Sequence, residues 1–129
     1  MKKERIAASI CNLRWEKALE TTFNRFGLKK EQVANAAFMN VRNIYRYLNG
    51  IIPQKKSLVQ LLIAMELPLE VSLALIHAAG YSLSASSADV FYRTLLENPK
   101  AVNVLEANEM IEEYNRQVGK NAIPLFKLN

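Results

Sequence analysis

The sequence predicts an all-α protein, and three observations support that fold class. Apolar residues recur at helical spacing along most of the chain, whereas the polar–apolar alternation of a β-strand never persists. The four glycines and four prolines are few for 129 residues, and most of them stand where a helical pattern begins or ends. Half of the residues are hydrophobic, so the chain can bury a core of its own.

The first predicted helices lie in the N-terminal third of the chain. Residues 1–14 carry apolar side chains at helical spacing, but they could also form an extended arm. Residues 15–26 are predicted to form an amphipathic helix, because large apolar side chains recur on one side before Gly27 ends the pattern. The next helix, 29–37, has small residues on its buried side, so another helix can approach it closely.

A short helix is predicted over residues 41–48, with Asn40 as its N-cap and Asn49-Gly50 at its end. On a wheel of about 100° per residue this helix has two faces. The packing face holds apolar and aromatic side chains, namely Val41, Ile44, Tyr47 and Leu48. The other face holds long side chains that form hydrogen bonds, namely Arg42, Tyr45, Arg46 and Asn49.

Further helices are predicted in the second half of the chain, at residues 57–66, 68–79, 87–97 and 101–117. Pro68 suits the first turn of the second of these helices. Ser86 or Ser87 can cap the third, and Asn98-Pro99 breaks the chain after it.

Residues 120–129 are not expected to be helical, because Pro124 lies in the middle of them. The apolar side chains of Ile123, Leu125 and Phe126 would face water if this segment were free, so we expect them to pack on the protein. Together with the acidic helix over 101–117, the segment can add to the core or form a surface for a second subunit or another partner. We favour dimerisation.

Charge is distributed unevenly along the chain, which has a net charge of +5. Residues 1–56 hold twelve Lys or Arg and four Glu, whereas residues 57–129 hold five Lys or Arg and eight Asp or Glu. A basic N-terminal half indicates an acidic partner, of which nucleic acid is the commonest. The plainer alternative is a basic surface that only keeps the protein in solution.

The sequence predicts no enzyme, no cofactor and no metal site. Cys11 is the only cysteine, so no internal disulfide can form and a reducing cytosol is the natural compartment. His77 has no second His or Cys near it, which favours a packed or capping role. The chain has neither a glycine-rich phosphate loop nor a nucleophile with a base at useful spacing. The solvated face of a helix accounts for the acidic residues Glu106, Glu109, Glu112 and Glu113.

No membrane segment is predicted either. The most apolar stretch, Leu58–Gly80, is interrupted by Glu66, Pro68 and Glu70, so two short helices fit it better than a membrane span. The basic start of the chain is not followed by the apolar region of a signal peptide. We therefore expect a cytoplasmic protein.

A short helix, a connection of a few residues and a second short helix over residues 28–50 form a helix-turn-helix layout. This stretch, "LKKEQVANAAFMNVRNIYRYLNG", resembles the helix-turn-helix of lambda-repressor-like, or Cro/xenobiotic-response-element, regulators. The residues that fill the family pattern are Leu28, Val33, Ala34, Met39, Asn40, Ile44, Arg46 and Asn49-Gly50. The similarity continues through "AGYSLSASSAD" and covers residues 26–98.

The resemblance implies a five-helix DNA-binding core over residues 15–80, preceded by an arm or helix at 1–14 and followed by additional helices at 81–129. It implies base contacts in the major groove from the start of the second helix, namely from Val41, Arg42, Tyr45 and Arg46. Phosphate positions of the family fall on Lys30, Asn40 and Asn49. Lys29 also stands at a helix start, where phosphate is attracted, and Lys55 and Lys56 add charge on the same side.

The chain departs from the family pattern at the turn between the two helices. The family usually has a glycine there with positive φ, whereas this chain has Phe38. A bulky residue in that conformation is strained by about 1 kcal/mol or more, so we expect either strain or a rebuilt turn. Tyr47 also stands where the family usually has an aliphatic residue.

These observations predict a sequence-specific regulator of transcription that binds double-stranded DNA, with repression as its expected mode. We expect a homodimer associated with the nucleoid, because two-fold dimers read two half-sites. The alternative is a protein-binding adaptor or antitoxin-like module on the same scaffold, with little affinity for DNA. Phe38 and the acidic second half favour that alternative.

Overall fold

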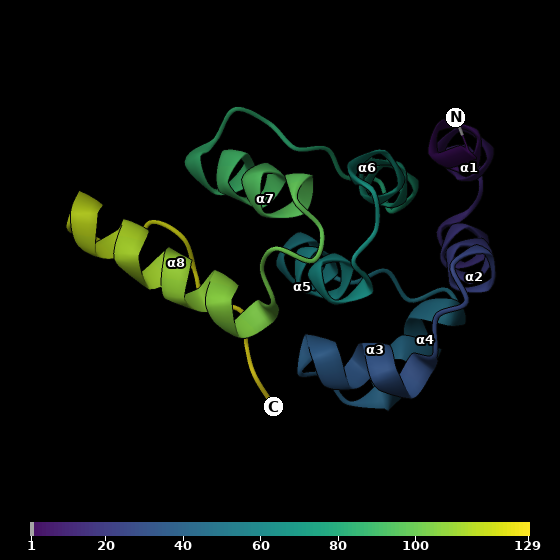
Figure 1. The fold of residues 1–129 in the computed structure, drawn as a ribbon, viewed down its shortest axis with the longest axis horizontal. Helices are drawn as coiled ribbons and strands as arrows, with labels where there is room; N and C mark the ends of the chain where they lie inside the picture. The colour runs from purple at the N-terminus through teal and green to yellow at the C-terminus, as the bar shows by residue number, and fades with distance from the viewer. Residues whose placement is uncertain (1) are drawn as a thin grey trace.

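The computed structural model describes residues 2–129, which form helices and connecting loops without a strand (Figure 1). This confirms the predicted all-α class. The helices are α1 (Lys2–Ile10), α2 (Trp15–Arg25), α3 (Lys30–Ala37), α4 (Val41–Leu48), α5 (Lys55–Met65), α6 (Leu69–Ala78), α7 (Ser87–Glu97) and α8 (Val104–Val118). No helix in this range is long and apolar enough to cross a membrane.

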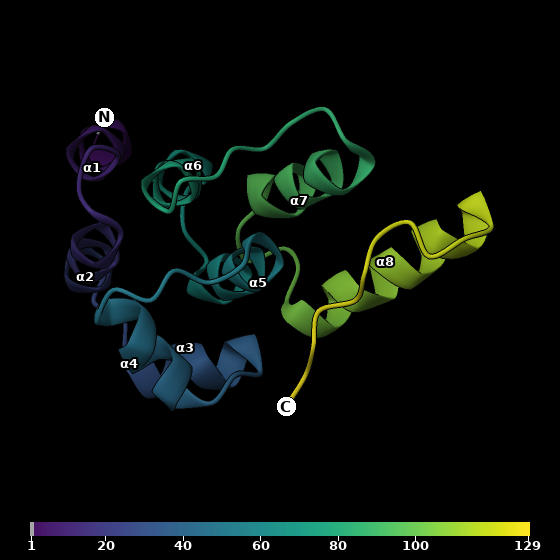
Figure 2. The same ribbon diagram turned by 180° about the vertical axis from the view of Figure 1, so that it is seen from behind.

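Helix α5 lies at the centre of the molecule, between α3 on one side and α6, α7 and α8 on the others (Figures 1 and 2). Seven of its eleven residues are buried, so it is covered nearly all round, as the middle helix of a core must be. Helix α1 packs on α6 and places Ile10 fully inside the core. The first residues therefore form a helix and not an extended arm.

The bounds of α4 and α7 are those predicted, and the bounds of the other helices differ from prediction by a few residues. The largest difference is at α8, which begins at Val104 and not at 101. The reason is a capping box, in which Asn103 Oδ1 accepts from the Glu106 N–H at 2.8 Å and Glu106 Oε1 accepts from the Asn103 N–H at 2.9 Å. Glu106 is thus a capping residue as well as part of an exposed acidic face.

Helix α3 ends in the left-handed conformation at Phe38, with φ 57° and ψ 42°. The Met39 N–H donates to Ala34 O at 2.9 Å and the Phe38 N–H donates to Asn35 O at 3.2 Å, which is the bond pattern of a Schellman motif. Helices α2, α4, α6 and α8 end in the same way, each with a glycine where α3 has Phe38. The strained form of the predicted turn is therefore the one found.

We expect the Phe38→Gly variant to be more stable than the Phe38→Ala variant by about 1–2 kcal/mol, since both lack the aromatic ring and only Cβ disfavours the left-handed backbone. Urea unfolding measures the difference as a shift of the midpoint at constant slope. Ala36→Gly is the matched control, because a glycine inside α3 is expected to destabilise by up to about 1 kcal/mol. Equal stability of the two Phe38 variants would show that the turn is not strained.

Residues 120–129, hereafter the return segment, run back along α8 in the opposite direction (Figure 2). Two asparagines of α8 each form a pair of hydrogen bonds with its backbone. Asn115 donates to Ile123 O at 2.9 Å and accepts from the Ile123 N–H at 3.0 Å. Asn108 donates to Phe126 O at 3.0 Å and accepts from the Phe126 N–H at 2.8 Å.

The return segment completes the core beside α7 and α8. Ile123 and Phe126 are 0% and 2% exposed, and the Phe126 ring stacks on Tyr92 with 6.0 Å between centroids. The prediction that the segment packs on the protein is confirmed for these two residues. It is wrong for Leu125, which is 42% exposed, because the hydrogen bonds between Asn108 and the Phe126 backbone seat the Phe126 ring on the core and leave Leu125 outside it.

Candidate nucleic-acid interface

Helix α4 divides into the two faces that the wheel predicts. Ile44 is fully buried and Tyr47 is buried to 9% exposure, so they attach the helix to the core. Val41 and Leu48 are half-buried at the edges of that face. Exposed side chains make up the opposite face, namely Arg42, Tyr45, Arg46 and Asn49. Burial raises the pKa of Tyr47, although nearby Arg46 lowers it, so the phenol stays neutral near pH 7.

Asn40 caps α4 as predicted. Its backbone is extended, with φ −68° and ψ 137°, and its Oδ1 accepts from the Arg42 N–H at 2.9 Å. The cap fixes where the helix begins, and therefore which side chains lie on the exposed face. Among the side chains that the structure describes, neither Arg42 nor Arg46 forms an ion pair with a carboxylate.

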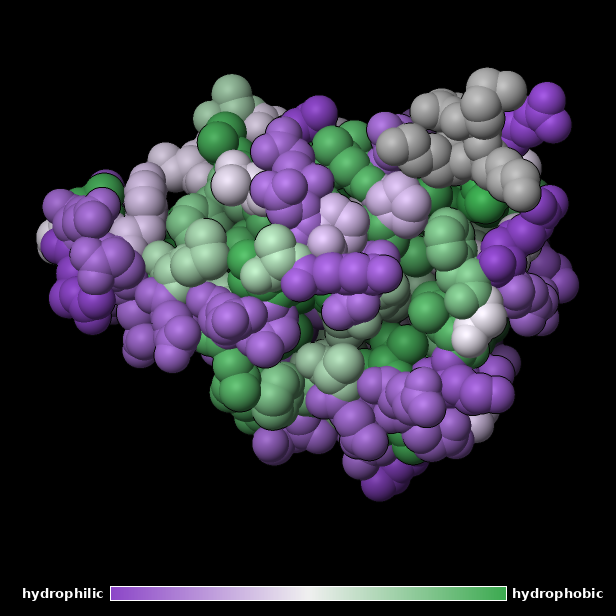
Figure 3. Space-filling model, viewed as in Figure 1, coloured by the Kyte–Doolittle hydropathy of each residue, from purple (hydrophilic) through white to green (hydrophobic). Residues whose placement is uncertain are grey.

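The start of α3 lies beside this exposed face. The Lys30 ammonium is 5.9 Å from the centroid of the Tyr45 ring, a cation–π distance. Lys29 is the exposed N-cap residue of the same helix. The structure thus brings together two predicted phosphate-contacting lysines and a predicted base-contacting tyrosine. Hydrophilic side chains gather over α3 and α4 at the lower right of Figure 3.

Lys55 and Lys56 were predicted for the same site, but both have partners within the protein. The Lys55 ammonium lies 2.9 Å from Asp89 Oδ2, and the Lys56 ammonium donates to Leu125 O at 3.2 Å. The sequence could not reveal these partners, because they are 34 and 69 residues further along the chain. Both lysines therefore help to hold the C-terminal region. A phosphate contact from either lysine stays a prediction, because an ammonium group has three donors and each of these has one partner here.

Two exposed residues near α4 were not singled out from the sequence. Ile51 and Ile52 are both 49% exposed in the loop that follows the helix. The Trp15 Nε1–H donates to Ile51 O at 2.9 Å and holds this loop against α2. A pair of β-branched apolar residues directly after a helix-ending glycine was the signal available in the sequence. We add both to the candidate interface as apolar contacts.

Asp89 is buried at the start of α7 and accepts hydrogen bonds from Ser84 and Lys55. Burial raises the pKa of its carboxyl, but the bonds from the Ser84 N–H, the Lys55 ammonium and the Ser84 hydroxyl outweigh that effect. The pKa therefore lies below the ordinary value. Of the two caps predicted for this helix, Ser86 and Ser87, the Ser86 hydroxyl is the one that caps it.

We expect Asp89→Asn to destabilise the protein by about 1–3 kcal/mol at pH 7, because Lys55 loses its charged partner. A lowered pKa in the folded state contributes stability above about pH 3.9, and that stability is lost as pH falls through the folded value. The variant should therefore lose less stability than the unmodified protein between pH 7 and pH 3 in urea unfolding. Glu97→Gln, exposed on the same helix, is the control. Parallel pH profiles for Asp89→Asn and the unmodified protein would contradict the assigned ion pair.

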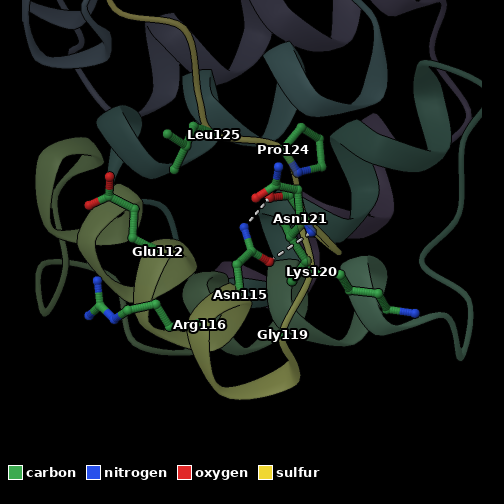
Figure 4. Close-up of a pocket in the computed structure, with 9 residues that line it drawn as sticks. Glu112, Asn115, Arg116, Gly119, Lys120, Asn121, Pro124 and Leu125 are labelled. Carbon is green, nitrogen blue, oxygen red and sulfur yellow. Dashed lines mark hydrogen bonds between the residues drawn. The ribbon is translucent and has the colours of Figure 1, made fainter.

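A groove lies apart from the α4 face, between the C-terminal half of α8 and the return segment (Figure 4). It is an open groove of about 790 Å³, with Glu112, Arg116 and Lys120 among its lining residues. Arg116 forms an ion pair with Glu113, and Asn115 is held by Ile123, so several of the polar groups there are already used. Charges of both signs line the groove, and it favours no one class of ligand.

Other residues with possible chemistry lie apart from both features. His77 is exposed in the last turn of α6, and Cys11 is a half-buried free thiol. Among the side chains that the structure describes, those of residues 5–129, no cluster of three or more His, Cys, Asp or Glu could hold a metal ion. Comparison of the chain with protein-family models, curated proteins and solved structures found no match. The resemblance to lambda-repressor-like regulators therefore stays a prediction.

Proposed function

We propose that this protein is a sequence-specific regulator, acting as a repressor, that reads the major groove of double-stranded DNA with α4. In this proposal α2 to α6 correspond to the five-helix core of lambda-repressor-like proteins. The observation that carries the proposal is the exposed face of α4, where Arg42, Tyr45 and Arg46 stand on a helix fixed by its cap and by buried Ile44.

The dimensions of α4 suit this role. A helix with its side chains is about 10–12 Å wide, and the major groove of B-DNA is about 12 Å wide. The guanidinium fork of an arginine can bond both acceptors of guanine, and Arg42 and Arg46 are one turn apart on the helix. Val41, half-buried at the start of α4, can contact a thymine methyl group.

Phosphate contacts are proposed from residues around that face. Lys29 and Lys30 lie at the start of α3, Asn40 at the start of α4 and Asn49 at its end. Helix starts attract phosphate through free N–H groups and the helix dipole. Contacts of this kind position a protein on DNA and make binding sensitive to salt.

The C-terminal region is proposed to make the protein a homodimer. Exposed apolar side chains occur on α8 and the return segment, namely Leu105, Met110, Val118, Leu125 and Leu128. Burying them between two copies would set the distance between two α4 helices. Reading of two half-sites requires that distance to be about 34 Å, one turn of DNA.

The proposal is tested by selecting bound duplexes from a random pool and measuring affinity for the selected sequence by fluorescence anisotropy. We expect one preferred, two-fold symmetric sequence and an affinity that falls steeply as salt rises. Light scattering on the free protein measures its oligomeric state. Absence of any salt-dependent binding to duplex DNA would reject the proposal.

That negative result would favour the adaptor function instead. The same exposed apolar residues stand among the carboxylates Glu109, Glu112 and Glu113, a mixture that also suits a protein partner with basic residues. An adaptor should show little binding to random duplex DNA even at low salt.

A further inference from the structure

The C-terminal end of α3 is held by two distant parts of the chain. The last carbonyl groups of a helix have no partner within it. Here Ala37 O accepts from the Gln60 side-chain amide at 2.6 Å, and Phe38 O accepts from the Asn129 N–H at 3.2 Å. Figures 1 and 2 both show the end of the return segment beside the α3–α4 turn, residues 38–40. The residues just before the proposed DNA-reading helix are therefore bonded to α5 and to the return segment.

Gln60 links the end of α3 to the return segment through its side-chain amide. It is 3% exposed and lies among apolar residues in the middle of α5. Its amide nitrogen donates to Ala37 O at 2.6 Å and to Lys127 O at 2.9 Å, which uses both N–H groups. Burial of an amide is unfavourable unless its hydrogen bonds are made. If this position only filled space in the core, a leucine would therefore be more stable there than a glutamine. The glutamine is suited to tying two backbone segments together.

The α3–α4 turn needs such support because its backbone is strained. Phe38 has a left-handed backbone that its side chain disfavours, and such a conformation persists only where surrounding contacts hold it. Helix α4 begins three residues later and is about 12 Å long, so a rotation of about 10° at the turn moves its far end by about 2 Å. A displacement of that size breaks a hydrogen bond to a base edge.

The return segment is itself held in place along its length. Asn108 and Asn115 of α8 bond its backbone in pairs, Phe126 is buried against Tyr92, and the Lys56 ammonium donates to Leu125 O. The far end of this segment can therefore act as a fixed support for the turn. The chain of contacts runs from α8 through the return segment and Gln60 to the end of α3.

We infer that Gln60, with the return segment, is a positioning residue that sets the orientation of α4 for reading DNA. The inference rests on the proposed function, since it concerns how the same face is presented. It assigns the C-terminal region a part in base discrimination in addition to any role in dimerisation. Gln60 itself makes no contact with DNA in this scheme.

The test uses the full chain and two kinds of variant. Gln60→Leu keeps the volume of the side chain and removes both hydrogen bonds. Asn129→Pro removes the N–H that donates to Phe38, and Asn129→Ala is its matched control because it keeps that N–H. Ile76→Val, in the core of α6, is the control for a general loss of stability.

Two measurements are made on each variant. Hydrogen exchange reports opening of the amides of residues 38–43 relative to those of α6. Anisotropy reports the preference for the selected duplex over a scrambled one. We expect Gln60→Leu to speed exchange at the turn by about tenfold and to reduce the preference by about tenfold. Non-specific affinity should change less than about twofold, because the phosphate-contacting lysines are untouched.

Asn129→Pro should also speed exchange at the turn and reduce the preference for the selected duplex, but by smaller factors. Asn129→Ala and Ile76→Val should change neither the exchange nor the preference. Unchanged exchange at the turn in Gln60→Leu overturns the inference, and so does faster exchange with full base discrimination. If the unmodified protein binds no DNA, the proposed function fails. The exchange measurement then still decides whether Gln60 and Asn129 hold the turn.

Discussion

Replacing Arg42 or Arg46 by alanine is expected to weaken binding to the selected duplex by about 1–3 kcal/mol for each residue. Both side chains are exposed on α4, and within the described residues neither pairs with a carboxylate, so their donors can reach base edges. Each variant should also lose its preference at one position of the site. Anisotropy titrations against single-base variants of the selected duplex, at fixed salt, measure both effects.

Arg93→Ala is the matched control for charge, because Arg93 is an exposed arginine on α7, where it pairs with Glu97. It should leave base preference unchanged. Lys29→Gln and Lys30→Gln should weaken binding to all sequences alike and flatten the salt dependence. Intact discrimination in both Arg42→Ala and Arg46→Ala would show that the reading face is assigned wrongly.

Phe126→Ala is expected to destabilise the protein by about 3–5 kcal/mol. The ring is 2% exposed, stacks on Tyr92 and joins the return segment to the core, so its removal leaves a cavity between α7 and α8. Urea unfolding followed by circular dichroism measures the loss. It would be a large fraction of the stability of an ordinary domain.

The neighbouring variant Leu125→Ala is the control for this position. Leu125 is 42% exposed and lies in the same segment, so its truncation should change stability by less than about 0.5 kcal/mol. A similar loss in both variants would mean that the return segment is not seated on the core through Phe126.

The features that could be predicted from the sequence are those that depend on interactions between residues close together in the chain. Asn40 caps α4 and Ser86 caps α7 through bonds within three residues. The amino acids at those positions were therefore enough to predict the Asn40 cap and to restrict the cap of α7 to Ser86 or Ser87. Ile44 and the arginines of α4 fall on opposite faces because the helical period alone separates them. The positive φ at Phe38 was one of two outcomes expected for that turn.

The parts that could not be predicted depend on partners far along the chain. Two neighbouring lysines at a helix start, Lys55 and Lys56, suggested a phosphate site. In the folded chain the Lys55 ammonium pairs with Asp89, and the Lys56 ammonium donates to Leu125 O of the return segment. Leu125 and Phe126 are neighbours with similar hydropathy, and only the seating of the backbone on α8 decides which one is buried.

Periodicity, caps and glycine positions were thus sufficient for the all-α class, for the helices and for the two faces of α4, since each depends on interactions within about one helical turn. The docking of the return segment, the internal use of Lys55 and the support of the α3–α4 turn by Gln60 and Asn129 required the folded chain. These contacts join groups 8 to 91 residues apart, and no local pattern specifies which donor meets which carbonyl group.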